Sequence, residues 1–156
     1  MIRNILFVCT GNSCRSIMAQ ELLKKMLKDK AKNFVIKSAG TSALEGMKAS
    51  SEAQRVMLKE GIDISSHRSV RLTKEMLLEA DLILVMEEAH KKIILEMYPE
   101  AEKKTYLLKS FKEDKSKDSN LEILDPIGKP PEVYEEVVFI LKESLEGLIK
   151  KFGLDK

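Results

Sequence analysis

Residues 5–16 read ILFVCTGNSCRS, and the architecture of the chain follows from this segment. Its first part, 5–9, is a short apolar run, which is typical of a strand buried on both faces of a parallel sheet. Small and turn-prone residues fill 10–14, and from Arg15 onward apolar side chains recur at helical spacing. The sequence therefore predicts a strand that turns tightly into a helix.

The alternation of strand and helix patterns continues along the chain, and it favours a parallel α/β sheet with right-handed crossovers. Ligands bind at the carboxyl ends of the strands in such sheets, so the turn after the first strand is the first candidate site. A polar segment at 110–129 interrupts the pattern, and its charged part, 112–120, is predicted to be an exposed, mobile loop. Further strands are predicted at 34–36 (stopped by the small residues 38–40), 81–86 and 104–108, and helices at 15–30, 50–60 (ended by Gly61), 87–97 and 130–152, with a short helix capped by Thr73.

The bulk composition bounds the class of protein. The 156 residues, of which 44% are hydrophobic and 33% charged, predict one folded domain over residues 1–156. The formal net charge of +2 comes from interspersed lysines and glutamates, which gives no basis for nucleic-acid binding. No apolar run is long enough to span a membrane, and 5–9 is too short for a signal peptide, so we expect a cytoplasmic protein.

The two cysteines, Cys9 and Cys14, lie too close together in the chain to staple a fold, so reactivity is the better reason to consider them. Gly11 and Asn12 tolerate a positive φ, which lets the loop turn its N–H groups inward as an anion-binding nest. The helix that follows adds the positive end of its dipole. This surrounding would stabilise a nucleophilic thiolate at Cys9, and Arg15 offers a planar fork that can hold two phosphate oxygens.

Other interpretations of this loop fit less well. A lone cysteine is usually a small buried hydrophobe, but the Cys-x5-Arg-Ser spacing between a strand and a helix favours a nucleophile, with Ser16 placed to donate a hydrogen bond to the thiolate. The loop lacks both the Gly-Lys-Ser/Thr ending of a Walker A motif and the spaced glycines of a dinucleotide loop. A zinc site is disfavoured because His67 and His90 are far apart in the sequence. We interpret His90 as a histidine of a lysine-rich helix without a role in the site.

Residues 8–16, VCTGNSCRS, resemble the signature of the low-molecular-weight protein tyrosine phosphatase family, which includes bacterial protein arginine phosphatases. The resemblance covers nearly the whole chain, and it continues in order through SAGT at 38–41, SHR at 66–68, ADLILVM at 80–86 and LDP at 124–126. It implies a flavodoxin-like three-layer fold, with a central four-stranded parallel sheet of order 2-1-3-4 and helices on both faces. It also implies an enzyme that needs neither cofactor nor metal.

The resemblance assigns roles to particular residues. Asp125 is implied to be the general acid and base, and Pro126 restricts its backbone to extended geometry. Cys14 is implied to be a redox partner of Cys9. The implied phosphate-binding residues are Thr10, Gly11, Asn12, Ser13, Cys14, Arg15 and Ser16. Asn12, Ser16, Ser38 and His67 are implied to support the loop, and Leu44 and Ile127 to line the substrate pocket.

The implied reaction is hydrolysis of a phosphorylated protein through a phosphocysteine on Cys9, with phosphate and vanadate as inhibitors. Phosphotyrosine is the first expected substrate. Phosphoarginine is the alternative, because Ser13 is small and hydroxylated as in arginine-specific bacterial relatives, and because 38–60 resembles those relatives in length. Ile127 stands where an aromatic residue is often found, so neither substrate has full support. An arsenate reductase is disfavoured because it would need cysteines beyond Cys14. A non-catalytic anion-binding module is disfavoured because binding alone requires neither a nucleophile nor an acid.

Overall fold

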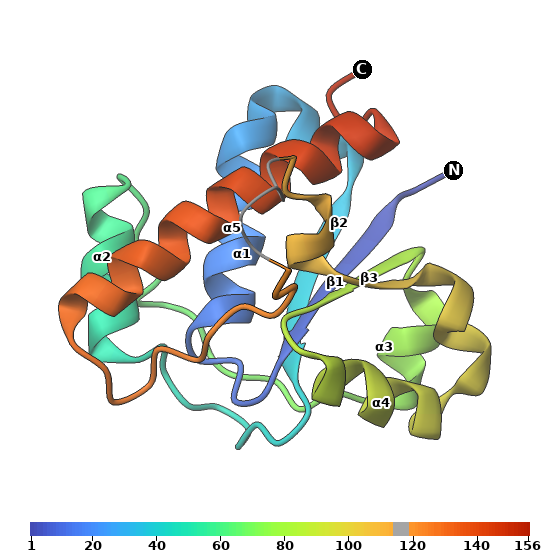
Figure 1. Ribbon diagram of the computed structural model, residues 1–156, viewed down its shortest axis with the longest axis horizontal. Coiled ribbons are helices and arrows are strands. Elements are labelled where there is room, and N and C mark those ends of the chain that lie inside the picture. Colours follow the sequence, from blue (N-terminus) through green and yellow to red (C-terminus); the bar gives the residue numbers. More distant parts are fainter. Residues whose placement is uncertain (114–118) are drawn as a thin grey trace.

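The computed structural model describes residues 1–113 and 119–156, and it contains one four-stranded sheet in the order β2-β1-β3-β4 (Figure 1). Every neighbouring pair of strands is parallel. The predicted flavodoxin-like arrangement and strand order are therefore confirmed. The strands are β1 (Asn4–Cys9), β2 (Val35–Gly40), β3 (Leu82–Val85) and β4 (Thr105–Leu107).

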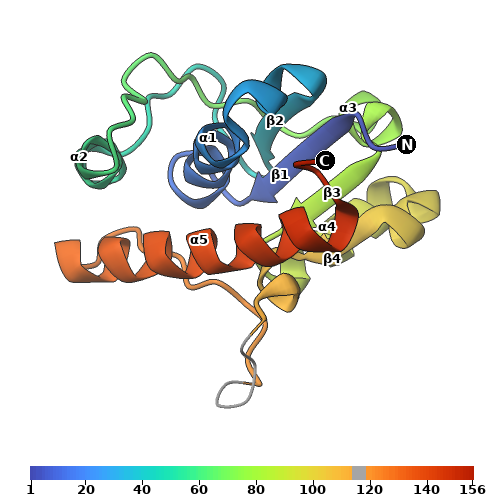
Figure 2. The same ribbon diagram turned by 90° about the horizontal axis from the view of Figure 1, so that it is seen from above.

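Helices cover both faces of this sheet. Figure 2 shows α1 and α5 on one side of the strands and α3 and α4 on the other. The predicted cap Thr73 is confirmed, because its side chain accepts a hydrogen bond from the Met76 amide at the start of α3. Ser50, predicted as the first residue of a helix, caps α2 in the same way by accepting from the Ala53 amide. The helices are α1 (Arg15–Leu27), α2 (Ser51–Lys59), α3 (Lys74–Glu79), α4 (Glu88–Met97) and α5 (Pro131–Phe152), joined in part by the 3-10 turns η1 (Lys28–Asn33), η2 (Pro99–Lys104) and η3 (Leu108–Phe111).

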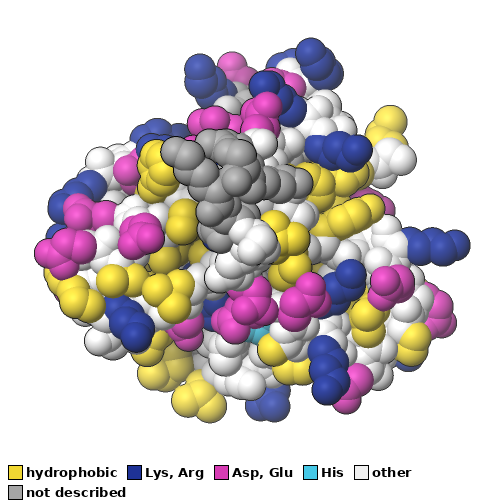
Figure 3. Space-filling model, viewed as in Figure 1, with side chains coloured by type: hydrophobic (Ala, Val, Ile, Leu, Met, Phe, Trp, Pro, Cys, Tyr) yellow, Lys and Arg dark blue, Asp and Glu magenta, His cyan; other side chains and the backbone are white. Residues whose placement is uncertain are grey.

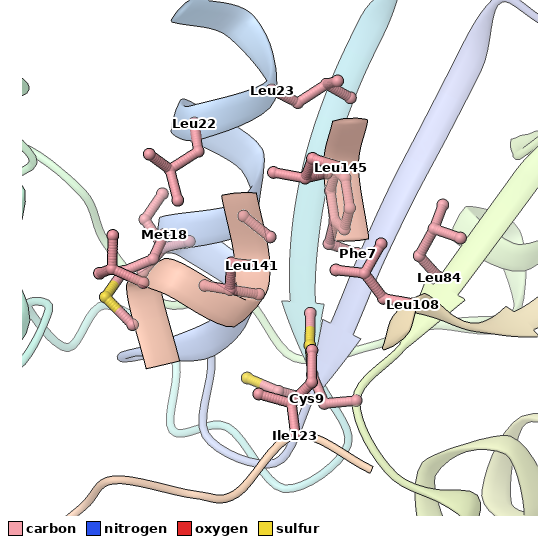
Figure 4. Close-up of a cluster of buried hydrophobic side chains, with 14 of the residues drawn as sticks. Phe7, Cys9, Met18, Leu22, Leu23, Leu84, Leu108, Ile123, Leu141 and Leu145 are labelled. Carbon is pink, nitrogen blue, oxygen red and sulfur yellow. The ribbon is translucent and has the colours of Figure 1, made fainter. Parts of the chain in front are cut away.

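The central strands β1 and β3 are buried on both faces, and alternate residues of β1 enter two different cores. Phe7 and Cys9 pack with side chains of α1, α2 and α5, whereas Leu6 and Val8 pack on the side of α3 and α4. Figure 4 shows part of the larger core, with Cys9 at the carboxyl end of β1 beside Ile123. The nucleophile candidate thus sits where the larger core meets the carboxyl edge of the sheet.

Several boundaries differ from the sequence prediction by one or more residues. The helix expected over 15–30 ends at Leu27, because Lys28 takes a φ of 54° and the chain continues as η1. The small residues 38–40 were expected to stop the second strand, but β2 runs through them and Gly40 pairs with Cys9. Buried pairing with β1 thus outweighs the weak strand preference of small side chains. The strand expected over 81–86 is limited to Leu82–Val85.

The polar segment after η3 was predicted to be an exposed loop, and most of it, 114–118, lies outside the described residues. At its start, Lys112 and Glu113 form ion pairs with Glu143 and Lys150 of α5. Within the part of the chain that is described, no helix is long and apolar enough to cross a membrane.

Candidate active site

The loop between β1 and α1 is held to the neighbouring strand end by backbone hydrogen bonds. The Thr41 and Ser42 amides donate to the carbonyls of Cys9 and Thr10, each at 2.9 Å. A Cβ atom on Gly40 would lie 2.5 Å from the Thr10 carbonyl oxygen, so only glycine permits this approach. Gly40 therefore supports the loop, a role that sequence reasoning missed because it interpreted this residue as the end of a strand.

The Cys9 thiol lies at the floor of the loop and is almost fully buried, with 3% of the residue exposed. Its sulfur is 2.9 Å from the hydroxyl oxygen of Ser16, in the first turn of α1. Asn12 Nδ2 donates to that same oxygen at 2.8 Å, so Ser16 Oγ accepts from Asn12 and can still donate its own proton to the sulfur. The Cys9 sulfur thus has a hydroxyl within hydrogen-bonding distance on the helix that follows the loop.

Asn12 is the centre of the hydrogen-bond network that supports the loop. It is fully buried and has a φ of 55°. Its Nδ2 also donates to Ser38 Oγ at 2.9 Å, its Oδ1 accepts from the Val70 amide at 2.9 Å, and its backbone oxygen accepts from His67 Nε2 at 2.8 Å. The structure thus joins Asn12 to Ser16, Ser38 and His67. Gly11 was also expected to take a positive φ, but it does not, so Asn12 is the residue of this loop with a left-handed backbone.

The Arg15 side chain is buried, with 2% exposed, and three groups hold it. Its Nη1 donates to Glu87 Oε2 at 2.5 Å and to the Ile123 carbonyl at 2.7 Å. Its Nη2 lies 3.6 Å from Asp125 Oδ2. Glu87 follows the end of β3, which is the strand next to β1, and sequence reasoning missed it. The signal available in the sequence was that the acidic residue Glu87 comes directly after a predicted strand, where ligand-binding residues of parallel sheets lie.

The segment that carries Asp125 returns to this edge after the polar loop. The Ile123 amide donates to the Met86 carbonyl at 2.9 Å, which anchors the segment beside β3. The Asp125 side chain is 44% exposed, and its Oδ1 accepts from the Ile127 amide at 3.1 Å. A carboxylate that is exposed to solvent and within 3.6 Å of Arg15 is placed to exchange protons with a bound group.

His90 was expected to have no role in the site, and the structure instead connects it to the loop. It is buried, and its Nε2 lies 2.8 Å from Thr10 Oγ1. The Glu87 amide donates to its Nδ1 at 3.1 Å. Burial, followed by the positive charge of Arg15, lowers the pKa of His90 below its ordinary value.

Cys14 is the second buried thiol, and both cysteines are free. Its sulfur contacts the hydroxyls of Ser50 at 3.2 Å, Tyr134 at 3.7 Å and Ser13 at 3.8 Å. Burial raises the pKa of the Cys14 thiol, and it raises the pKa of Tyr134 to about 12. Cys14 is therefore a protonated thiol among hydroxyls at neutral pH.

The two expected pocket-wall residues are exposed: Leu44 at 69% and Ile127 at 52% of their surface. Their role in the pocket wall stays a prediction.

Figure 3 shows acidic side chains gathered near the centre of one face, with a patch of histidine between them. No group of three or more His, Cys, Asp or Glu side chains that could hold a metal ion occurs in residues 1–113 and 119–156.

The fold and the geometry of this edge define a class: an α/β protein with a buried thiol at the end of its first strand, an arginine, and an exposed carboxylate within reach of that arginine. A sequence profile described as low molecular weight phosphotyrosine protein phosphatase matches residues 4–156. The chain belongs to this family.

Individual relatives agree with this assignment. A protein-arginine-phosphatase of Geobacillus stearothermophilus is 42% identical over 149 residues, which cover 96% of this chain and 93% of the relative. The crystal structure of the low molecular weight protein tyrosine phosphatase from T. tengcongensis has a TM-score of 0.86 at 42% identity, over 96% of this chain and 99% of that one. The tyrosine phosphatase Wzb from Escherichia coli K30, in complex with sulphate, has a TM-score of 0.86 at 35% identity, over 98% and 100% of the two chains.

Proposed function

We propose that this protein is a phosphoprotein phosphatase that transfers the phosphoryl group of its substrate to Cys9 and then to water. The observation that carries the proposal is the meeting of four groups at one end of β1. The Cys9 sulfur has a hydroxyl donor in Ser16, and the buried Arg15 guanidinium lies 3.6 Å from the exposed carboxylate of Asp125. A thiol that only packs in a core requires neither the arginine nor the carboxylate.

The first half of the reaction forms a covalent intermediate. The Cys9 thiolate attacks phosphorus in line with the leaving atom, so a sulfur–phosphorus bond forms as the bond to the leaving atom breaks. Arg15 and the loop amides of 10–16 hold the three equatorial oxygens, where negative charge is shared in the transition state. Protonated Asp125 gives its proton to the leaving atom, so a neutral phenol or guanidine departs.

The second half restores the enzyme. Asp125, now a carboxylate, takes a proton from a water molecule, and the oxygen of that water attacks phosphorus. The sulfur–phosphorus bond breaks, inorganic phosphate leaves, and Cys9 is again a thiolate beside Ser16. The positive charge of Arg15 serves both halves, and Glu87 holds that guanidinium in the same position throughout.

Phosphotyrosine is the substrate we propose first, because the matching family is described by it. Phosphoarginine is the second candidate. Ser13 gives the loop a small hydroxyl side chain, Ile127 offers no aromatic surface, and the relative from G. stearothermophilus is named a protein-arginine-phosphatase. An aromatic wall would favour a phenyl ring by stacking, and Ile127 cannot supply one.

The proposed activity is tested with p-nitrophenyl phosphate as substrate and vanadate as inhibitor. We expect vanadate-sensitive turnover in the wild-type protein and none in Cys9→Ser, which should still bind inorganic phosphate in a calorimetric titration. Appreciable turnover by Cys9→Ser would refute the covalent route.

The substrate preference is tested by comparing phosphotyrosine and phosphoarginine peptides of one sequence. If Ser13 permits the guanidinium to enter, Ser13→Ile should lower kcat/KM for phosphoarginine relative to phosphotyrosine by about tenfold or more. An unchanged ratio of the two kcat/KM values would show that Ser13 does not determine the substrate preference.

The cellular setting belongs to the proposal as well. We place the enzyme in the cytoplasm as one domain, with phosphorylated proteins as its partners and no role for nucleic acid or a membrane. Cys14 lies in the same loop as Cys9, so a peroxide that oxidises Cys9 to a sulfenic acid allows Cys14 to displace water and form a disulfide. Thiol reduction would reverse this step, whereas overoxidation of Cys9 would not be reversed.

A further inference from the structure

The imidazole of His90 connects two parts of the proposed phosphate site that come from different elements. On one side, its Nε2 lies 2.8 Å from the Thr10 hydroxyl, in the residue that follows Cys9. On the other, its Nδ1 lies 3.1 Å from the amide of Glu87, whose carboxylate holds Arg15. A single buried side chain of α4 thus contacts the first residue of the loop and the backbone amide of the residue whose carboxylate holds Arg15.

The hydrogen bonds determine which ring nitrogen carries the proton. A backbone N–H can only donate, so Nδ1 must accept from Glu87 with its lone pair. The ring proton is therefore on Nε2, and it is donated to Thr10 Oγ1. The Thr10 hydroxyl proton is then left to point away from His90. A second ring proton would set an Nδ1–H against the Glu87 N–H and would break that hydrogen bond.

We propose that His90, as the neutral Nε2–H tautomer, is a positioning residue that holds Thr10 and the Glu87–Arg15 pair in the arrangement that receives a phosphoryl group. This inference rests on the proposed function. His90 is buried, so the two hydrogen bonds are made away from bulk water. Glu87 lies next to the end of β3, and Thr10 follows the end of β1, so the imidazole also links two neighbouring strand ends.

The electrostatic surroundings of His90 keep it neutral. Burial is the largest influence on its pKa, and the positive charge of Arg15 acts in the same direction. The carboxylates of Glu87, Asp125 and Glu122 oppose them, and the net effect lowers the pKa of His90. The imidazole is therefore in its accepting form at neutral pH, as the hydrogen bond from the Glu87 amide requires.

The first test observes the tautomer directly, without reference to activity. A long-range proton–nitrogen NMR spectrum of the imidazole groups resolves the two histidines of the chain, and His90→Asn assigns the signals by removing one set. We expect the Nε2–H tautomer for His90 and a clear displacement of its Nε2–H signal in Thr10→Val. An Nδ1–H tautomer, or a signal that Thr10→Val leaves unchanged, would overturn the inference.

The second test measures the inhibition constant of inorganic phosphate with p-nitrophenyl phosphate as the reporter. His90→Asn keeps an acceptor for the Glu87 amide but is too short to reach Thr10, and Thr10→Val removes the hydroxyl with little change of shape. Each should raise the inhibition constant by about 3- to 10-fold, the typical effect of losing one hydrogen bond. The inhibition constant of the double variant should exceed that of the more affected single variant by no more than about twofold, because both substitutions remove the same hydrogen bond.

The matched control is Lys92→Asn, which makes the same kind of replacement at an exposed position of α4. It should leave the inhibition constant unchanged. A purely structural role for His90 predicts a lower melting temperature with an unchanged inhibition constant, and that result would contradict the inference while leaving the proposed function intact. A wild-type protein that neither turns over p-nitrophenyl phosphate nor binds phosphate would refute the proposed function, and the inference with it.

Discussion

At the scale of single residues, Asn12 shows how one side chain can fix the shape of the loop after β1. Its amide group makes buried hydrogen bonds to Ser16 and Ser38 and a partly buried one to the Val70 amide. Its backbone is left-handed, a conformation that asparagine tolerates better than most residues. Asparagine therefore suits this position for two reasons, its hydrogen bonds and its tolerance of a left-handed backbone.

Asn12→Ala and Asn12→Gly separate these two contributions. Both variants leave buried partners unsatisfied, so we expect each to lower the free energy of unfolding by about 2 to 4 kcal/mol. Alanine should cost about 1 kcal/mol more than glycine, because only alanine is strained at a φ of 55°. Urea unfolding followed by circular dichroism measures both values. Equal losses in the two variants would show that backbone strain is not significant at this residue.

At the scale of elements, the site depends on the close approach of the end of β2 to the loop after β1. Gly40 permits this approach, because a Cβ atom there would meet backbone atoms of Thr10 and Asn12 at 2.5 and 2.8 Å. Backbone cannot move aside as a flexible side chain can. The strand that carries Ser38 therefore also sets the position of the loop beside it.

Gly40→Ala should consequently shift the loop and lower kcat/KM for p-nitrophenyl phosphate by about 100-fold or more, the typical consequence of a displacement of about 1 Å in a catalytic site. Unfolding should also become easier by about 1 to 3 kcal/mol, as in other overpacked sites. Gly11→Ala is the stability control, because a Cβ atom there would meet only the Ser13 hydroxyl at 3.5 Å. Comparable loss of stability in the two variants would contradict the argument from close approach.

The amino end of β1 is tied to the start of β3 by a carboxylate. Asp81 Oδ2 accepts from the amides of Arg3 at 2.9 Å and Asn4 at 2.8 Å. The hydrogen bond from the Asn4 amide, followed by that from Arg3, lowers the pKa of Asp81 below 3.8. Because the folded state prefers the ionised form, this stabilisation is fully present above that ordinary value and is lost as the pH falls through the lowered pKa.

Asp81→Asn should therefore lower the free energy of unfolding at neutral pH by about 1 kcal/mol, a value kept small because the carboxylate is close to solvent. The difference from the wild type should shrink below about pH 4. Denaturant titrations at several pH values measure it. Asp155→Asn, near the exposed end of the chain, should change stability by less than about 0.5 kcal/mol. A difference for Asp81→Asn that is constant with pH would contradict the assignment.

At the scale of the whole molecule, the chain could be assigned to an α/β sheet from its alternating patterns, and most elements lie within a few residues of their predicted positions. The apolar runs at 5–9 and 81–86 are strong signals because strands buried on both faces carry few polar residues. The end of β2 was missed because residues 38–40 are small, and small side chains carry little strand preference.

The site was predictable where its residues are contiguous and less so where they come together through the sheet. Cys9, Arg15 and their loop stand in one motif, and the resemblance to a family supplied Asp125. Glu87 and His90 follow another strand, and nothing in their local pattern distinguishes them from ordinary residues at the start of a helix. Their importance arises only because β3 lies directly beside β1 and brings both strand ends to the same edge.

The covalent step on Cys9 is the claim on which the whole account depends, and trapping the intermediate tests it most directly. The wild-type protein is mixed with p-nitrophenyl phosphate, quenched in acid within milliseconds and digested with a protease. The mass of the peptide that contains Cys9 is then measured by mass spectrometry. We expect an added phosphoryl group on Cys9 that accumulates further in Asp125→Asn, where the water is no longer activated. Turnover without any phosphoryl group on this peptide, or with the group on another residue, would contradict it.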